Sequence, residues 1–219
     1  MKASVIRAKY LKFLVDRGHV SIPPTTIVPE NDPTTLFTGS GMQPMMPYLL
    51  GEKHPLGDRL TDSQPSFRTD DIEEVGDNRH TCMFEMLGNW SLGSYWKEEQ
   101  LGWMFEFLTK EIGLDPSKLY VSVFYGDSTL SIPRDDEAIS IWQKLFADNQ
   151  IEAKVVDLDT EENGYKVGMQ GGRIFSYGVK KNWWSRAGIP ANMPAGEPGG
   201  PDSEIFYDLG QNVGCKRIG

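Results

Sequence analysis

The sequence has little cysteine, no long apolar run and fewer basic than acidic residues. Its two cysteines, Cys82 and Cys215, are too few for a disulfide scaffold or a four-thiolate zinc site. No apolar run approaches the roughly 18 residues of a membrane-spanning helix, and the amphipathic N-terminus does not resemble a secretion signal. The net charge of −9 excludes a protein that coats nucleic acid with a basic face. We expect one acidic globular domain in the cytoplasm.

The common catalytic motifs are also missing. The sequence has no GxxxxGK[ST] phosphate loop, no GxGxxG turn after a strand, no GxSxG elbow and no HExxH pair. Its three histidines, His19, His54 and His80, are too scattered to predict a metal cluster. The chemistry of this protein must therefore come from another arrangement of side chains.

Helices and strands alternate along the chain around one long hairpin. Apolar residues at helical spacing predict helices at 4–17, 97–112 and 135–147. The sequence predicts two strands joined by an acidic loop, at about 59–68 and 80–90. β-Branched and aromatic residues predict a strand at 119–125, and shorter strand patterns lie at 151–158 and 203–209. Glycine and proline predict a loop over 185–202. The first two strands, joined by an acidic loop, form an antiparallel hairpin. This order favours an α+β fold, an antiparallel β-sheet flanked by helices.

The hairpin carries the side chains that a nucleotide site needs. Arg68 ends its first strand, and Arg79 and His80 begin the second. Guanidinium groups grip phosphate oxygens in a planar fork, and the ring of Phe84 on the second strand suits stacking on a purine. These residues predict a nucleotide site without a glycine-rich loop. The alternative is that both arginines only pair with the acidic residues between the strands, because such surface ion pairs are common.

Several unusual strings resemble one enzyme family. FRTDDIEEVGDNRHTCMFEMLGNWSLGSYWK at 67–97 is similar to the second signature motif of class II aminoacyl-tRNA synthetases. VPENDPTTLFTGSGM at 28–42, NWW at 182–184 and SEIFYDLG at 203–210 resemble the alanyl-tRNA synthetase family in the same order. The resemblance implies that residues 1–219 are the N-terminal portion of a class II catalytic domain. The family's third motif and its downstream domains are then not in these residues.

The resemblance also implies an activity and its partners. It implies activation of alanine by ATP with Mg²⁺, followed by transfer of alanine to the 3′ end of its tRNA, which would be held mainly by regions outside these residues. It leaves the oligomeric state open, a homo-oligomer included. Two alternatives remain: a paralogue that binds a nucleotide or a partner without catalysis, and a ligase that loads an amino acid onto a carrier protein.

The resemblance assigns the nucleotide to five residues. Arg68 matches the motif arginine that holds the α-phosphate of ATP and the carboxylate of the amino acid. Arg79 matches the residue that reaches the β- and γ-phosphates, and His80 lies beside it. Phe84 falls where the adenine ring stacks, and Met42 lies in the loop after the family's first motif.

The resemblance assigns three further residues to binding the amino acid or the metal. Trp184 resembles the tryptophan that walls the small amino-acid pocket. Glu204 lies where the class often places an acid that holds Mg²⁺ against the phosphates, and Asp208 is the second candidate.

Overall fold

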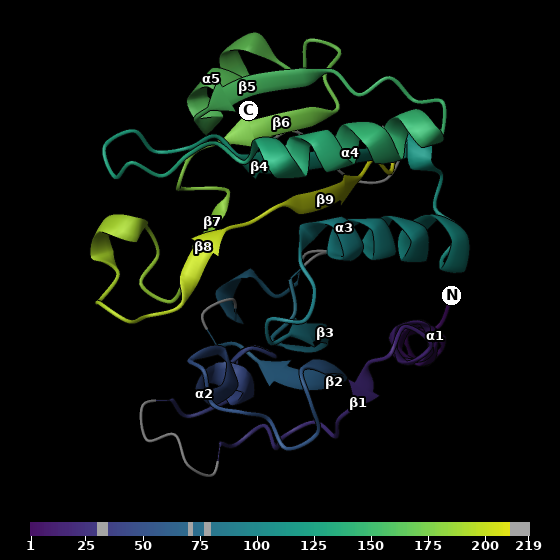
Figure 1. Cartoon of the computed structure of the whole chain (residues 1–219), viewed down its shortest axis with the longest axis vertical. Helices are drawn as coiled ribbons and strands as arrows, with labels where there is room; N and C mark the ends of the chain where they lie inside the picture. Colours follow the sequence, from purple (N-terminus) through teal and green to yellow (C-terminus); the bar gives the residue numbers. More distant parts are fainter. Residues whose placement is uncertain (30–34, 70–71, 77–79, 211–219) are drawn as a thin grey trace. The chain divides into compact units, whose positions relative to one another are not determined.

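A computed structural model describes residues 1–29, 35–69, 72–76 and 80–210. The chain divides into two compact units, Met1–Trp96 (the first unit) and Lys97–Gly219 (the second unit). The first unit holds α1 (Ala3–Val15), β1 (Val20–Ser21), α2 (Met46–Leu49), β2 (Arg59–Phe67) and β3 (Met83–Ser91), with 3₁₀ turns at Gln43–Met45 and Ile72–Glu74. Figure 1 traces these elements along the chain.

The second unit contains the remaining elements. They are α3 (Lys97–Glu106) with a π-helical turn (Phe107–Glu111), β4 (Leu119–Phe124), α4 (Asp136–Asp148), β5 (Val155–Asp159), α5 (Glu161–Val167), β6 (Ile174–Tyr177), β7 (Trp183–Ser185), β8 (Gly199–Pro201) and β9 (Glu204–Tyr207), with 3₁₀ turns at Pro116–Lys118 and Pro190–Asn192.

The first unit is built on the predicted hairpin. Strands β2 and β3 pair antiparallel from Arg59↔Ser91 to Phe67↔Met83, and β1 adds a short parallel edge to β2. Helix α1 packs beside this sheet with Tyr10 and Leu14 buried, as its apolar spacing predicts. The Tyr10 hydroxyl donates to Asn89 Oδ1 on β3 at 3.0 Å, which fixes the helix to the sheet.

The second unit has a mixed sheet in the order β5-β6-β4-β9. Strands β5, β6 and β4 run parallel, and β9 pairs antiparallel with β4. Parallel neighbours need crossover connections, which α4 and α5 supply after β4 and β5. Strands β7 and β8 form a separate antiparallel hairpin between β6 and β9 (Figure 1).

One face of this sheet is buried under α3 and α4. Trp142 and Phe146 of α4 are fully buried there against Val121 of β4 and Ile174 of β6. Helix α4 begins at Asp135, whose carboxylate accepts from the Ala138 N–H at 3.0 Å. Burying the apolar stripe of α4 against these strands gives the unit its hydrophobic core.

The predicted fold class is confirmed, since sheets flanked by helices make up both units. The three predicted helices and the hairpin are also found. Two expectations were wrong in detail. Residues 185–202 are not all loop, because β8 and a 3₁₀ turn lie within them. The second sheet is not purely antiparallel, because its β5–β6 and β6–β4 pairs are parallel.

Candidate functional site

Arg68 is held in place on two sides at the end of β2. Its Nε donates to the Gly39 carbonyl at 2.9 Å, and its guanidinium lies 5.2 Å from the centre of the Phe84 ring. Its backbone N–H donates to the Cys82 carbonyl at 3.0 Å, which continues the hairpin ladder. The side chain is exposed, and it takes part in no ion pair between the described residues. Two terminal amino groups of Arg68 are therefore left to bind an anion.

Phe84 and Met42 lie in the same unit as Arg68. Phe84 is half-buried on β3 opposite Ser66, so its ring stands on the sheet face that the 39–45 segment adjoins. In that segment the Gly41 N–H points at Met86 Sδ at 3.2 Å, next to the half-buried Met42. The structure thus brings Arg68 and Phe84 together, with the Met42 loop close to the same strands.

The other two hairpin residues are less fully described. Arg79 lies outside the described residues, so its predicted role remains untested. His80 is exposed just before β3. The alternative, that the acidic loop engages these arginines, stays untested, because Asp70, Asp71 and Asp77 also lie outside the described residues.

Trp184 lies on the β7–β8 hairpin of the second unit. It is directly opposite Gly200 in the register, and its side chain is 37% exposed. The preceding Trp183 turns the other way, because side chains alternate along a strand. Its ring lies 5.7 Å from that of Phe124 on β4, which packs one side of the hairpin onto the sheet.

A buried amide anchors the base of this hairpin. Asn182 is fully buried, and its Nδ2 donates to Ser122 Oγ on β4 at 2.9 Å and to Asp202 Oδ1 at 3.0 Å. The Asp202 N–H donates back to the Asn182 carbonyl at 3.2 Å. Burial raises the pKa of Asp202 to about 6, the Asn182 amide opposes that rise, and nearby Glu204 adds to it. Sequence analysis missed Asn182, although it belongs to the NWW string.

The two predicted metal ligands lie at opposite ends of β9. Glu204 is exposed and pairs with Ser122 of β4 in the register. Asp208 follows the strand, and its Oδ1 accepts from the Gly210 N–H at 2.7 Å. At about 3.3 Å of rise per residue the two lie roughly 13 Å apart along the chain, so they cannot hold the same ion.

A metal would therefore have a single carboxylate from β9. No group of three or more metal-ligating side chains gathers anywhere in the described residues. Mg²⁺ that arrives with nucleotide phosphates needs only one or two protein carboxylates. The exposed Glu204, which forms no ion pair among the described residues, fits that requirement.

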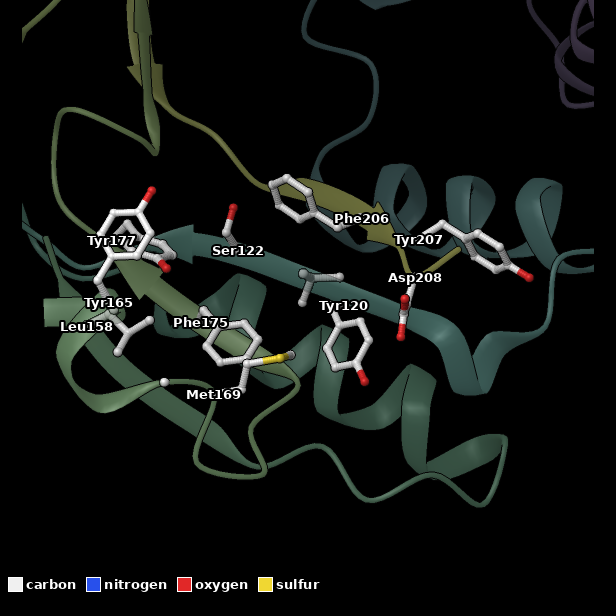
Figure 2. Close-up of a pocket in the computed structure, with 13 residues that line it drawn as sticks. Tyr120, Ser122, Leu158, Tyr165, Met169, Phe175, Tyr177, Phe206, Tyr207 and Asp208 are labelled. Atoms are coloured by element: carbon white, nitrogen blue, oxygen red, sulfur yellow. The ribbon is translucent and has the colours of Figure 1, made fainter. Parts of the chain in front are cut away.

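The second sheet also has an aromatic cleft that the sequence analysis did not predict. It has a volume of about 900 Å³ and lies on the face opposite α4. Figure 2 shows Tyr120 of β4 and Phe175 of β6 next to Phe206 of β9 and Met169. Asp208 lines this cleft, unlike Trp184 and Glu204. The alternating aromatic positions of YVSVF, IFSY and EIFY were the signal that could have revealed it.

The predicted site residues thus divide between the two units. Arg68, Phe84 and Met42 belong to the first, and Trp184, Glu204 and Asp208 to the second. In the described part of the chain, no helix is both long and apolar enough to span a membrane.

Comparison with known proteins identifies the class of protein to which this chain belongs. A family model described as "tRNA synthetases class II (A)" matches residues 5–218. The chain therefore belongs to the class II aminoacyl-tRNA synthetases, as its motifs predict. This membership implies ATP and a divalent metal in general terms.

Individual proteins similar to this chain are all alanine–tRNA ligases among those compared below. The alanine–tRNA ligase of Treponema denticola is 45% identical over 210 residues, which cover 94% of this chain and 30% of the relative. That of Treponema pallidum is 42% identical over 99% of this chain and 32% of the relative. That of Rubrobacter xylanophilus is 39% identical over 98% of this chain and 21% of the relative. The chain thus spans about a third or less of the length of these relatives.

Proposed function

We propose that this chain is the N-terminal, amino-acid-activating portion of an alanine–tRNA ligase. The whole enzyme would join alanine to ATP as alanyl-adenylate and then pass alanine to its tRNA. The observation that carries the proposal is the identity of 39–45% to alanine–tRNA ligases across 94–99% of the chain. The Arg68–Phe84 arrangement supports the ATP part of it.

The first step needs positioning and charge rather than a nucleophilic side chain. An oxygen of the alanine carboxylate attacks the α-phosphorus of ATP, the bond from phosphorus to the bridging oxygen breaks, and pyrophosphate leaves. Negative charge builds on the phosphate oxygens, where a fixed guanidinium stabilises it. Arg68 suits this task because Gly39 and Phe84 already fix its orientation.

The remaining candidates take the other roles that the resemblance implies. In this proposal Phe84 stacks on adenine beside Met42, Arg79 and His80 reach the outer phosphates, and Trp184 walls the alanine pocket. Glu204 is the proposed Mg²⁺ ligand and Asp208 the second choice. Mg²⁺, when bound, would neutralise phosphate charge.

In the second step a tRNA 3′ hydroxyl attacks the carbonyl carbon of the adenylate and AMP leaves. With a net charge of −9, this chain offers tRNA little electrostatic attraction. The proposal therefore assigns most tRNA contacts to other parts of the whole enzyme.

The test is alanine-dependent exchange of pyrophosphate into ATP by the 219-residue protein, with glycine and serine as competitors. We expect exchange that prefers alanine. In Arg68→Ala the loss of charge-assisted hydrogen bonds should weaken ATP binding by about tenfold or more, and Arg68→Lys should recover only part of it. Lys53→Ala, an exposed cation of the same unit, is the control.

Each possible result of these assays leads to a different conclusion about the proposed function. If exchange is absent, but calorimetry shows ATP binding that Arg68→Ala weakens, the chain is a half-site of the proposed enzyme. If ATP does not bind, or if exchange shows no preference for alanine, the proposal is wrong. Transfer of alanine to tRNA, measured with the whole enzyme, excludes a carrier-protein ligase.

A further inference from the structure

Trp184 has open space beside it because its cross-strand partner is a glycine. In an antiparallel pair, residues directly opposite stand on the same face with their Cβ atoms about 5 Å apart. Trp184 is opposite Gly200, which contributes no side chain to that face. A Cβ added at Gly200 would meet no atom within 4 Å. The indole therefore adjoins a space large enough for at least a methyl group.

The neighbouring glycine on the same strand, Gly199, lacks such a space. A Cβ at Gly199 would lie 2.6 Å from Met193 Cε and 2.8 Å from Ser185 Cβ, so packing requires glycine there. Gly200 has no such neighbour, and its φ lies outside the left-handed region. Among the described residues, neither packing nor backbone conformation requires a glycine at position 200.

The hairpin that bears this space is fastened at both ends. At its base, Asn182 joins Ser122 and Asp202 through the hydrogen bonds described above. Nearer its tip, Arg186 Nε pairs with Glu197 at 3.0 Å. The Gly200 space consequently has a defined position beside the indole, which a size-selective wall requires.

We propose that Gly200 is a specificity-determining residue of the amino-acid site, where its missing side chain leaves room beside Trp184 for the side chain of a small amino-acid substrate. This inference rests on the proposed function, and it states how the site would distinguish alanine from amino acids of a different size. A methyl group in a fitted apolar space is worth about 10- to 200-fold in selectivity. A methyl group supplied by the protein would compete for the same space.

The experiment compares the 219-residue protein with its Gly200→Ala and Gly102→Ala variants. Gly102 in α3 is a matched control, because a Cβ there also meets no atom within 4 Å outside the helix backbone, and α3 is a different element from the hairpin. Binding of L-alanine and of glycine is measured by calorimetry with ATP present. Thermal unfolding confirms that each variant is folded.

We expect Gly200→Ala to weaken alanine binding by about tenfold or more and glycine binding by less, so the preference shifts toward glycine. Gly102→Ala should leave both affinities unchanged. The inference is overturned if Gly200→Ala keeps the alanine affinity of the unaltered protein, or if alanine and glycine weaken equally.

The controls separate this inference from the proposed function. If the unaltered protein binds alanine and only the Gly200 prediction fails, the proposed function stands without the inference. If the unaltered protein binds ATP but no alanine, Trp184 and Gly200 form no alanine site in this chain and the inference is overturned, whereas the ATP part of the proposed function stands.

Discussion

The Arg68 side chain combines a fixed position with unused hydrogen-bonding capacity. One of its five N–H groups donates to the Gly39 carbonyl, and its guanidinium carbon lies over the Phe84 ring, 5.2 Å from the ring centre. An exposed lysine could supply the charge, but its flexible stem would have to be ordered when the substrate binds. This is why Arg68→Lys is expected to recover only part of the function.

His19 should make the stability of the first unit depend on pH. Its side chain is 3% exposed, and its two ring nitrogens form hydrogen bonds with the Leu14 carbonyl and the Tyr95 hydroxyl. Burial lowers the pKa of His19 below 6.5, the Leu14 carbonyl opposes this, and Arg59 adds to it. The unfolded chain then binds the proton first, so the free energy of unfolding should fall as pH drops below about 6.5.

Urea unfolding at pH 7.5, 6.5 and 5.5 measures this dependence, and His19→Gln should reduce it. The comparison of the two proteins is essential, because Asp202 titrates in the same window with the opposite sign. Its pKa of about 6 means that stability is lost as pH rises through that value. Equal pH dependence in both proteins would show that His19 contributes nothing.

At the scale of elements, β2 and β3 form the frame that places Arg68 and Phe84. Their pairing depends on a close approach at Gly88, directly opposite Asp62. Asp62 is 2% exposed and accepts a hydrogen bond from Trp90 Nε1 at 3.1 Å. Burial raises the pKa of Asp62, and that hydrogen bond opposes the rise. The hairpin therefore contains a carboxyl group that tolerates little displacement.

Gly88→Ala should destabilise this hairpin by about 1–3 kcal/mol, because overpacking a filled interior forces its neighbours to move. The new Cβ would collide with the Asp62 carboxylate and lie 2.9 Å from the Trp90 ring. Chemical denaturation measures the change in the free energy of unfolding. Gly102→Ala, which meets open space, should not destabilise the protein. Equal stability of Gly88→Ala and the unaltered protein would contradict this account.

At the scale of the whole molecule, the chain consists of two units that each have their own sheet. The second unit closes its core internally, with Val121, Val123, Trp142 and Phe146 all fully buried. The described residues of this core all belong to the second unit. A core of this kind can fold as an independent domain.

We expect the fragment Lys97–Gly219 to fold by itself and to unfold cooperatively in urea. Phe146→Ala should cost it about 3–5 kcal/mol, since the substitution leaves a cavity in the core. The Phe206 side chain is 51% exposed, so Phe206→Ala is the contrasting variant and should lower the free energy of unfolding much less. A fragment without a cooperative transition would show that the second unit depends on the first.

Elements with a long and local residue pattern could be predicted from the amino-acid sequence. The apolar stripe of α4 predicted that helix, and the two segments joined by an acidic loop predicted β2 and β3, each within a few residues. The residue types of the hairpin, together with the order of the resembling strings along the chain, predicted the family. Such signals survive in one sequence because each depends on neighbours three or four positions away, or on alternate residues.

The pairings between distant segments could be seen only in the folded structure. Strands β6, β7 and β8 have three or four residues each, so their conformation is selected by the strands they pair with. Asn182 meets Ser122 sixty residues away, and Trp184 faces Gly200 across a loop that the sequence left featureless. Hydrogen bonds and open space of this kind arise from non-local packing, which leaves no periodic trace in the chain.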